Sequence, residues 1–241
     1  KRQGVQLLRK LWQCGGALTA GGAMFCLAGL ELLSTQKLQL VDALSPLNAG
    51  LIISAMALSA IPTSILGGAT LHHVGFLPLI SGGFLFMAAG MALVVWTGGT
   101  MLPVLVCGLV LTGLGAGLAM SVSSTAIINA APPHRAGMAS GVEAVSYEFG
   151  TLISIALTGS LVPLLMAREL PPHLSELGTD ALHHHSSHAA ATSAYNAGYL
   201  FTIGGLSCFA LLFAAITAWC FRDNPKSGDP HAAHQQKDRS P

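Results

Sequence analysis

Charged side chains are scarce in this sequence. Asp, Glu, Lys and Arg together make up 9% of the 241 residues, whereas hydrophobic residues make up 52%. An ordinary globular domain carries about 25% charged residues, so this composition is typical of a membrane protein. The formal net charge is +1, and this balance indicates neither nucleic acid nor an acidic macromolecule as a partner.

Paired cysteines are also lacking. The chain has five cysteines, and none shows the Cys-x-x-Cys spacing of a redox or zinc motif. Because cysteine behaves as a small hydrophobic residue, we interpret these thiols as free and buried, and no disulfide framework is expected. Four of them, Cys26, Cys107, Cys208 and Cys220, lie within apolar runs, and Cys14 lies at the edge of one.

Enzyme motifs are missing as well. No His-Glu-x-x-His motif is present, which removes the simplest metalloprotease interpretation. Ser140 lies in a Gly-Met-Ala-Ser-Gly segment that resembles an intramembrane serine-protease loop, but such a serine needs a histidine base in a later helix, and residues 196–221 contain none. We therefore expect no enzymatic activity, no cofactor and no metal.

What the chain does contain is a series of long apolar runs. A helix needs about 20 largely apolar residues to cross a bilayer, and a membrane β-barrel would instead need segments of about ten residues with alternating polarity. The sequence therefore predicts an all-α membrane protein. The six expected spans cover residues 14–33, 47–71, 77–96, 102–128, 136–167 and 196–221.

The basic residues predict the orientation, because Lys and Arg in short loops stay on the cytoplasmic side. With the N-terminus inside, nine of the eleven Lys and Arg residues are cytoplasmic, and only Lys37 and Arg168 are outside. Residues 1–13 then form a cytoplasmic linker, and residues 222–241 form a disordered cytoplasmic tail. Both ends of the chain are expected in the cytoplasm.

The outer segment from residue 168 to residue 195 is the one long loop that we expect. It contains His183, His184, His185 and His188. Clustered histidines can bind zinc or copper, but no acid or cysteine stands at a fixed spacing from them. We favour a solvated loop, and metal binding remains the alternative. Lys37 and Asp42, in another outer segment, are also interpreted as solvated.

Two glutamates, Glu143 and Glu148, lie inside the fifth span. A carboxylate at the centre of a bilayer helix costs about 2.5–3.5 kcal/mol and usually faces a cavity with a transport function. By helical rise from Ala136, Glu143 lies about 10 Å and Glu148 about 18 Å into the span. The greater depth favours Glu148 as the proton-coupling residue, and the alternative is that the acids only fix helix packing.

The two acids are five residues apart, about 140° around the helix, so they cannot both point at one ligand. Tyr147 follows Glu143 by four residues and lies on the same face, where it can hydrogen-bond the carboxyl group or stack on an aromatic cation. A bound cation favours the ionised carboxylate, so proton release and cation binding can be linked at such a group. Glu143 and Tyr147 are therefore candidates for substrate binding, and Glu143 is also a proton-coupling candidate.

Glu31 is a further candidate for substrate binding. It lies about 25 Å along the first span, in the outer third. Its alternative interpretation is an interfacial acid that extends its carboxyl group to the membrane surface.

Glycines within the spans are interpreted as packing residues. Gly113 and Gly117, four residues apart in the fourth span, allow close contact between helices. Gly141 and Gly150 flank the two glutamates of the fifth span and would allow a neighbouring helix to approach or the helix to bend.

Several segments together resemble the C-terminal half of a major facilitator superfamily transporter. They are Leu-Gln-Leu-Val at 38–41, Ser-Pro-Leu-Asn-Ala-Gly-Leu at 45–51, and Pro-Pro-His-Arg-Ala-Gly-Met-Ala-Ser-Gly at 132–141. Within that superfamily the chain is similar to the fourteen-helix drug:proton antiporters, above all the methyl viologen and quaternary ammonium exporters, and residues 137–161 are the most specific part.

The resemblance implies that the six helices form one half-bundle, with substrate held near the midplane between two halves. It implies proton-coupled efflux of lipophilic, cationic drugs across the bacterial inner membrane, with acids of the penultimate helix, here Glu143 and Glu148, concerned with protons and cations. The chain begins at Lys1 rather than Met, and we expect a missing N-terminal half of the same polypeptide as its partner.

Two alternatives remain open. The same fold could carry another small solute, although the scarcity of basic residues within the spans argues against anions. The chain could also be a non-transport assembly or sensory subunit, in which the acids pair with basic residues of a partner.

Overall fold

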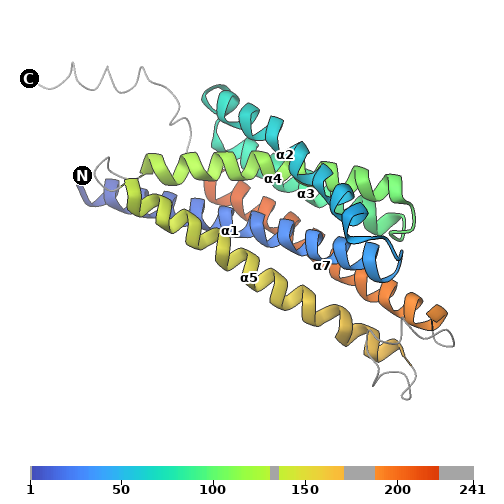
Figure 1. Ribbon diagram of the computed structural model, residues 1–241. Helices are drawn as coiled ribbons and strands as arrows, with labels where there is room; N and C mark the ends of the chain where they lie inside the picture. Colours follow the sequence, from blue (N-terminus) through green and yellow to red (C-terminus); the bar gives the residue numbers. More distant parts are fainter. Residues whose placement is uncertain (1, 131–135, 171–187, 223–241) are drawn as a thin grey trace, which may run out of the picture.

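A computed structural model of the chain describes residues 2–130, 136–170 and 188–222, which contain six α-helices and no β-strand. Each helix includes a stretch that is long and apolar enough to cross a membrane, which confirms the predicted all-α architecture (Figure 1). The helices are α1 (Arg2–Leu40), α2 (Pro46–Val74), α3 (Phe76–Trp96), α4 (Leu102–Ala130), α5 (Ala136–Glu169) and α7 (His188–Arg222).

Four helices match the expected spans to within three residues at each end, and two extend further. α1 continues in both directions, through the expected linker to Arg2 and past Leu33 to Leu40. The charge of Lys37 ended the apolar run in the sequence, but Lys37 is only 3% exposed and pairs with Asp42. The interpretation of Lys37 as solvated is therefore wrong, because an ion pair neutralises its charge inside the bundle.

α7 begins at His188, eight residues before the expected span. The segment 189–195 lies outside the expected span but inside the candidate membrane span Ala189–Ala218, and its Ala191, Ala194 and Tyr195 are buried. This helix therefore packs inside the bundle beyond the expected span. The histidines at 183–185 and the expected tail at 223–241 lie outside the described residues.

The breaks between helices follow local chemistry. Ser45 caps α2 by accepting a hydrogen bond of 3.3 Å from the Asn48 backbone N–H, and Pro46 occupies the first helical position. Gly75, with φ of 86°, separates α2 from α3, in a left-handed conformation that favours glycine.

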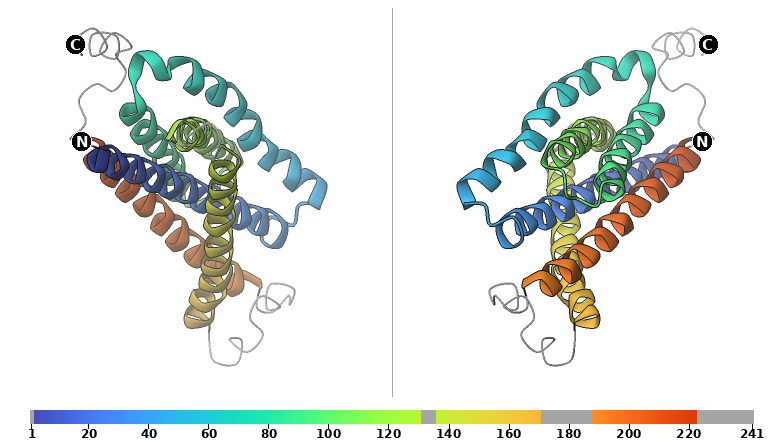
Figure 2. Two further views of the ribbon diagram at one scale, coloured as in Figure 1. Left: turned by 90° about the vertical axis from the view of Figure 1, so that its left-hand side faces the viewer. Right: turned by 90° about the vertical axis from the view of Figure 1, so that its right-hand side faces the viewer.

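α4 is the central helix of the bundle, with α2, α3 and α1 packed around it (Figure 2). Small residues make these contacts possible. A methyl group added to Gly83 of α3 would lie 2.8 Å from the Gly115 carbonyl oxygen of α4. On the other side of α4, side chains at Gly113 and Gly117 would overlap the Met56 and Ala60 carbonyls of α2, which confirms both as packing residues.

α5 packs mainly on α1 (Figure 1). The backbones meet where Gly150 faces Gly21, because a methyl group on Gly150 would overlap the Gly21 carbonyl group. Ser154 Oγ, one turn later, donates a hydrogen bond of 2.6 Å to the Phe25 carbonyl oxygen. Gly150 thus allows the predicted close approach, whereas a methyl group added to Gly141 would have no described atom within 4 Å. This contact holds the acid-bearing helix against α1.

The interior also contains aromatic rings from α1, α3 and α7. Phe25 and Phe209 have centroids 4.5 Å apart, and Phe213 contacts both Phe209 and Phe84 at 4.6 and 5.5 Å. In contrast, α2 and α5 expose many large apolar side chains, as expected of helices in contact with lipid or another membrane segment. Examples are Leu51, Leu58, Ile65, Val145, Phe149 and Leu152.

Candidate functional site

Glu143 and Tyr147 form a pair on α5. The Tyr147 hydroxyl donates a hydrogen bond of 3.1 Å to Glu143 Oε1, and both side chains are half-buried. The spacing of four residues stacks them on one helix face. The structure therefore confirms the predicted hydrogen bond and places a carboxylate beside an aromatic ring.

Neighbouring helices hold Tyr147 in place. Its ring packs against a small buried cluster of Ala20 from α1, Ile127 from α4 and Ala139 from α5. Its hydroxyl also interacts with the hydroxyl of Ser123 on α4, a residue that is fully buried. The pair is thus positioned at the junction of α1, α4 and α5, and Ser123 is a contact that the sequence analysis missed.

Glu148 lies on a different side of α5. Its side chain is exposed and makes no hydrogen bond or ion pair with any described residue. It precedes Ile153, the middle residue of the candidate span Gly137–Glu169, by five residues, which is about 7.5 Å of helical rise. The structure thus separates the two acids, and Glu148 points away from the Glu143–Tyr147 pair.

Glu31 lines a cleft of about 440 Å³ between α1 and α2. The lining of this cleft is largely apolar, and Glu31 is the one ionisable residue among the described residues that line it. Thr35, one turn after Glu31, and Ser54 on α2 add hydroxyl groups. The cleft therefore combines one carboxyl group with apolar walls and a few hydroxyl groups. The lining consists of Leu27, Glu31, Thr35, Gly50, Ile53, Ser54, Met56, Ala57 and Ala60.

The candidate residues therefore occupy separate places. Gly21 of α1 lies level with Gly150 of α5, and Glu31 follows Gly21 by ten residues, about 15 Å of helical rise. Glu31 is thus far along the bundle from Glu143 and Glu148, toward the end at which α1 finishes. The described residues do not bring the three acids into one pocket.

No group of three or more metal-ligating side chains lies among the described residues. The histidines at 183–185 fall outside them, so the alternative of a metal-binding loop stays a prediction.

Comparisons with known proteins agree with this architecture. The sugar (and other) transporter family matches residues 20–162, a range that includes all four candidate site residues. Stp, a multidrug resistance protein of Mycobacterium tuberculosis, is 29% identical over 161 residues, which are 67% of this chain and 30% of Stp.

Two further relatives have related names. SmvA, a methyl viologen resistance protein of Salmonella typhimurium, is 31% identical over 148 residues, 61% of this chain and 30% of SmvA. LfrA, a multidrug efflux pump of Mycolicibacterium smegmatis, is 30% identical over 139 residues, 56% of this chain and 27% of LfrA. The chain thus spans less than a third of the length of these relatives.

The family match covers more than half of the chain, and the six apolar helices have the lengths that a multi-pass membrane protein requires. The chain belongs to the sugar (and other) transporter family, within the major facilitator superfamily.

Proposed function

We propose that this chain forms part of a proton-coupled exporter of lipophilic, cationic toxic compounds in the bacterial inner membrane. Its termini face the cytoplasm, in agreement with the distribution of Lys and Arg. The names of Stp, SmvA and LfrA, which refer to multidrug resistance, methyl viologen resistance and multidrug efflux, support this substrate class.

The observation that carries the proposal is the Glu143–Tyr147 pair. A membrane-embedded carboxylate attracts a cation, and the face of an aromatic ring adds about 0.5–2 kcal/mol when the cation is desolvated. The pair presents both groups within one hydrogen bond of each other. The carboxylate repels an anion and offers a neutral solute only a hydrogen bond, whereas a cation gains both charge attraction and the ring face, so this geometry favours a cation.

Glu148 carries the proton in this proposal. It has no partner among the described residues and is exposed, so it is free to exchange a proton with water or with a second half of the transporter. Its position on another face of α5 lets it titrate without occupying the site at which Glu143 and Tyr147 meet the substrate. Proton movement supplies about 2.3 kcal/mol per charge for each 100 mV of membrane potential.

The Glu31 cleft is a second docking place for the cation, nearer the outer end. It combines one carboxyl group with apolar walls from α1 and α2. A substrate that leaves the Glu143–Tyr147 pair has to travel about 20 Å along the bundle toward the outside, and an intermediate carboxylate lowers the cost of that path.

A resistance assay tests the proposal in the full-length protein that contains this chain. Glu143→Gln removes the charge and should lower resistance to methyl viologen and quaternary ammonium compounds by about tenfold or more, the loss expected for one charge-assisted contact. The unaltered protein should confer no resistance to an anionic toxic compound.

The matched control is Glu169→Gln, the same change at an exposed acid at the end of the same helix. Both variants should reach the membrane in equal amounts. If Glu143→Gln confers the same resistance as Glu169→Gln, the carboxylate is not a substrate contact and the proposal fails.

A further inference from the structure

A stripe of polar side chains runs along α7 inside the bundle. Thr192, Tyr195, Asn196 and Tyr199 recur at the spacing of one helix face and span about 10.5 Å of helical rise. The side chain of Ser34 on α1 lies close to the Tyr199 hydroxyl across the α1–α7 contact. We name these five residues the α1–α7 polar stripe.

The oxygens of this stripe are buried without hydrogen-bond partners of good geometry. The atoms are Ser34 Oγ, Thr192 Oγ1, Tyr195 Oη, Asn196 Oδ1 and Tyr199 Oη, and none has such a partner among the described residues. Ser34, Tyr195 and Tyr199 are at most 1% exposed. Leaving such a group unpaired costs about 1–3 kcal/mol, and buried polar groups are normally bonded to protein or to ordered water.

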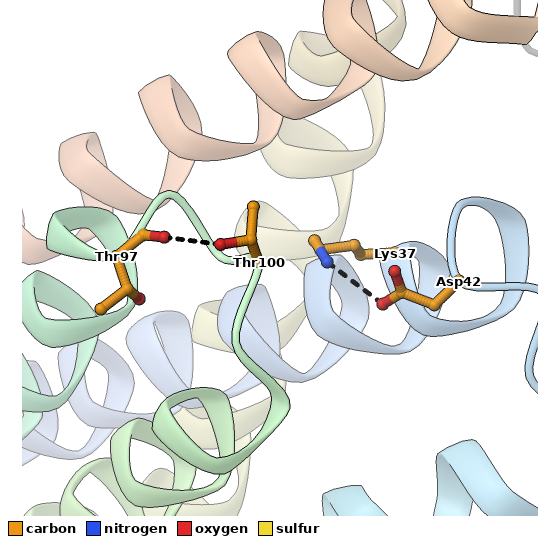
Figure 3. A network of polar contacts seen from close by, with 4 residues as sticks. All are labelled: Lys37, Asp42, Thr97 and Thr100. Atoms are coloured by element: carbon orange, nitrogen blue, oxygen red, sulfur yellow. Dashed lines mark hydrogen bonds and ion pairs between the residues drawn. The ribbon is translucent and has the colours of Figure 1, made fainter.

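Figure 3 shows the ion pair of Lys37 and Asp42, and the Lys37 ammonium group lies near Tyr199, at one end of the stripe. Lys37 Nζ is 3.1 Å from Asp42 Oδ2, and the Asp42 side chain is 39% exposed. The same ammonium group lies 5.8 Å from the centroid of the Tyr199 ring. Gly99, in the turn between α3 and α4, covers Tyr199 and Lys37. Asp42 therefore connects the buried stripe to the surface.

The Glu31 cleft lies near the same end of the stripe as the ion pair, because Ser34 lies beside Tyr199 and belongs to the turn of α1 that follows Glu31. Ser34 follows Glu31 by three residues on α1, a spacing that places two side chains about 5–6 Å apart at Cβ. Thr35, the next residue, lines the cleft itself. Two hydroxyl groups, those of Tyr199 and Ser34, therefore lie between the Lys37–Asp42 pair and the turn of α1 that carries Glu31 and Thr35.

We propose that the α1–α7 polar stripe is a water-lined proton path from the outer surface to Glu31. This inference rests on the proposed function, because it gives the inward proton a route and a first acceptor. Each hydroxyl accepts a proton from one neighbour and releases its own to the next, so the side chains are unchanged after each transfer. The net step moves one proton from outside water to the Glu31 carboxylate, which then releases a bound cation.

The presence of water in the stripe can be measured without any transport. X-ray radiolysis in H₂¹⁸O produces hydroxyl radicals from water that touches a side chain, including buried water. Tyr195 and Tyr199 should take up ¹⁸O, although both are buried. Phe84, which is equally buried in the aromatic core, should remain unlabelled. If Tyr195 and Tyr199 take up no more ¹⁸O than Phe84, the stripe contains no water and the proposed proton path is wrong.

Stopped-flow proton uptake tests the function of the path in proteoliposomes of the full-length protein. Tyr199→Phe should slow uptake from the outer side about tenfold, the factor for loss of one hydrogen bond, with an unchanged Kd for methyl viologen. The matched control is Thr202→Val, since this buried hydroxyl on α7 already bonds to the Gly198 carbonyl oxygen at 2.7 Å.

Equal uptake rates in Tyr199→Phe and Thr202→Val would show that the stripe is not the proton path, and would leave the proposed function untouched. Ser34→Ala provides a second variant with the same expected slowing, should Tyr199→Phe not fold. If the unaltered protein takes up no protons when substrate is added, the proposed function itself falls, and this outcome is distinct from a failure of the stripe.

Discussion

The contact between Gly150 and Gly21 predicts a specific response to a single methyl group. In Gly150→Ala, the new Cβ would lie 2.9 Å from the Gly21 carbonyl carbon, whereas carbon atoms in contact are normally about 3.5–4.0 Å apart. α5 must therefore move away from α1 by about 0.6 Å or more. Overpacking of this kind costs about 1–3 kcal/mol, more than the helix propensity that alanine gains over glycine, about 1 kcal/mol.

The movement of α5 in Gly150→Ala should also disturb the candidate site, because Tyr147 and Ser154 lie on either side of Gly150 and hold α5 against α4 and α1. Gly150→Ala should lower the midpoint of thermal unfolding in detergent and weaken binding of methyl viologen. The matched control is Gly159→Ala on the same helix, where the nearest atom, Leu32 Cδ2, lies at 3.9 Å from the added methyl group. If the two variants are equally stable, α1 and α5 are not in backbone contact and the described packing is wrong.

Four other variants test individual contacts. Ser154→Ala should lose about 1 kcal/mol of unfolding free energy, measured by thermal unfolding, because it removes the bond to the Phe25 carbonyl oxygen. Asp42→Asn should destabilise by about 1–3 kcal/mol, since it leaves a buried ammonium unpaired, whereas Lys37→Met should be nearly neutral; equal effects would contradict the burial of Lys37. Tyr147→Phe should weaken methyl viologen binding about fivefold, measured by equilibrium dialysis, because the ring remains and only the bond to Glu143 is lost.

Hydropathy predicted the helices well because the bilayer demands continuous apolar runs. The cores of all six spans lie inside the described helices. The expected spans were too short at the end of α1 and at the start of α7, where polar residues or a charge adjoin the most apolar stretch, although the candidate membrane spans Gly15–Leu40 and Ala189–Ala218 include both places. In these two segments Lys37 is buried and pairs with Asp42, and Tyr195 is buried inside the bundle. Such tertiary contacts are not visible in the hydropathy of a single segment.

The candidate site was predictable only where a single helix determines it. Tyr147 and Glu143 are four residues apart, so helical geometry alone indicated their hydrogen bond. Ser123 approaches from α4, and Ser54 joins Glu31 from α2. Such contacts depend on how helices cross, and helix crossing depends on small residues whose partners the sequence does not reveal.

The most direct test of proton coupling uses Glu148. The full-length protein is reconstituted into liposomes that contain a pH-sensitive dye, and methyl viologen is added to drive exchange. The unaltered protein and the Glu169→Gln control should move protons when the substrate moves, whereas Glu148→Gln should bind methyl viologen with an unchanged Kd and move no protons. Substrate-driven proton movement in Glu148→Gln at the unaltered rate would contradict the assignment of Glu148 as the proton carrier.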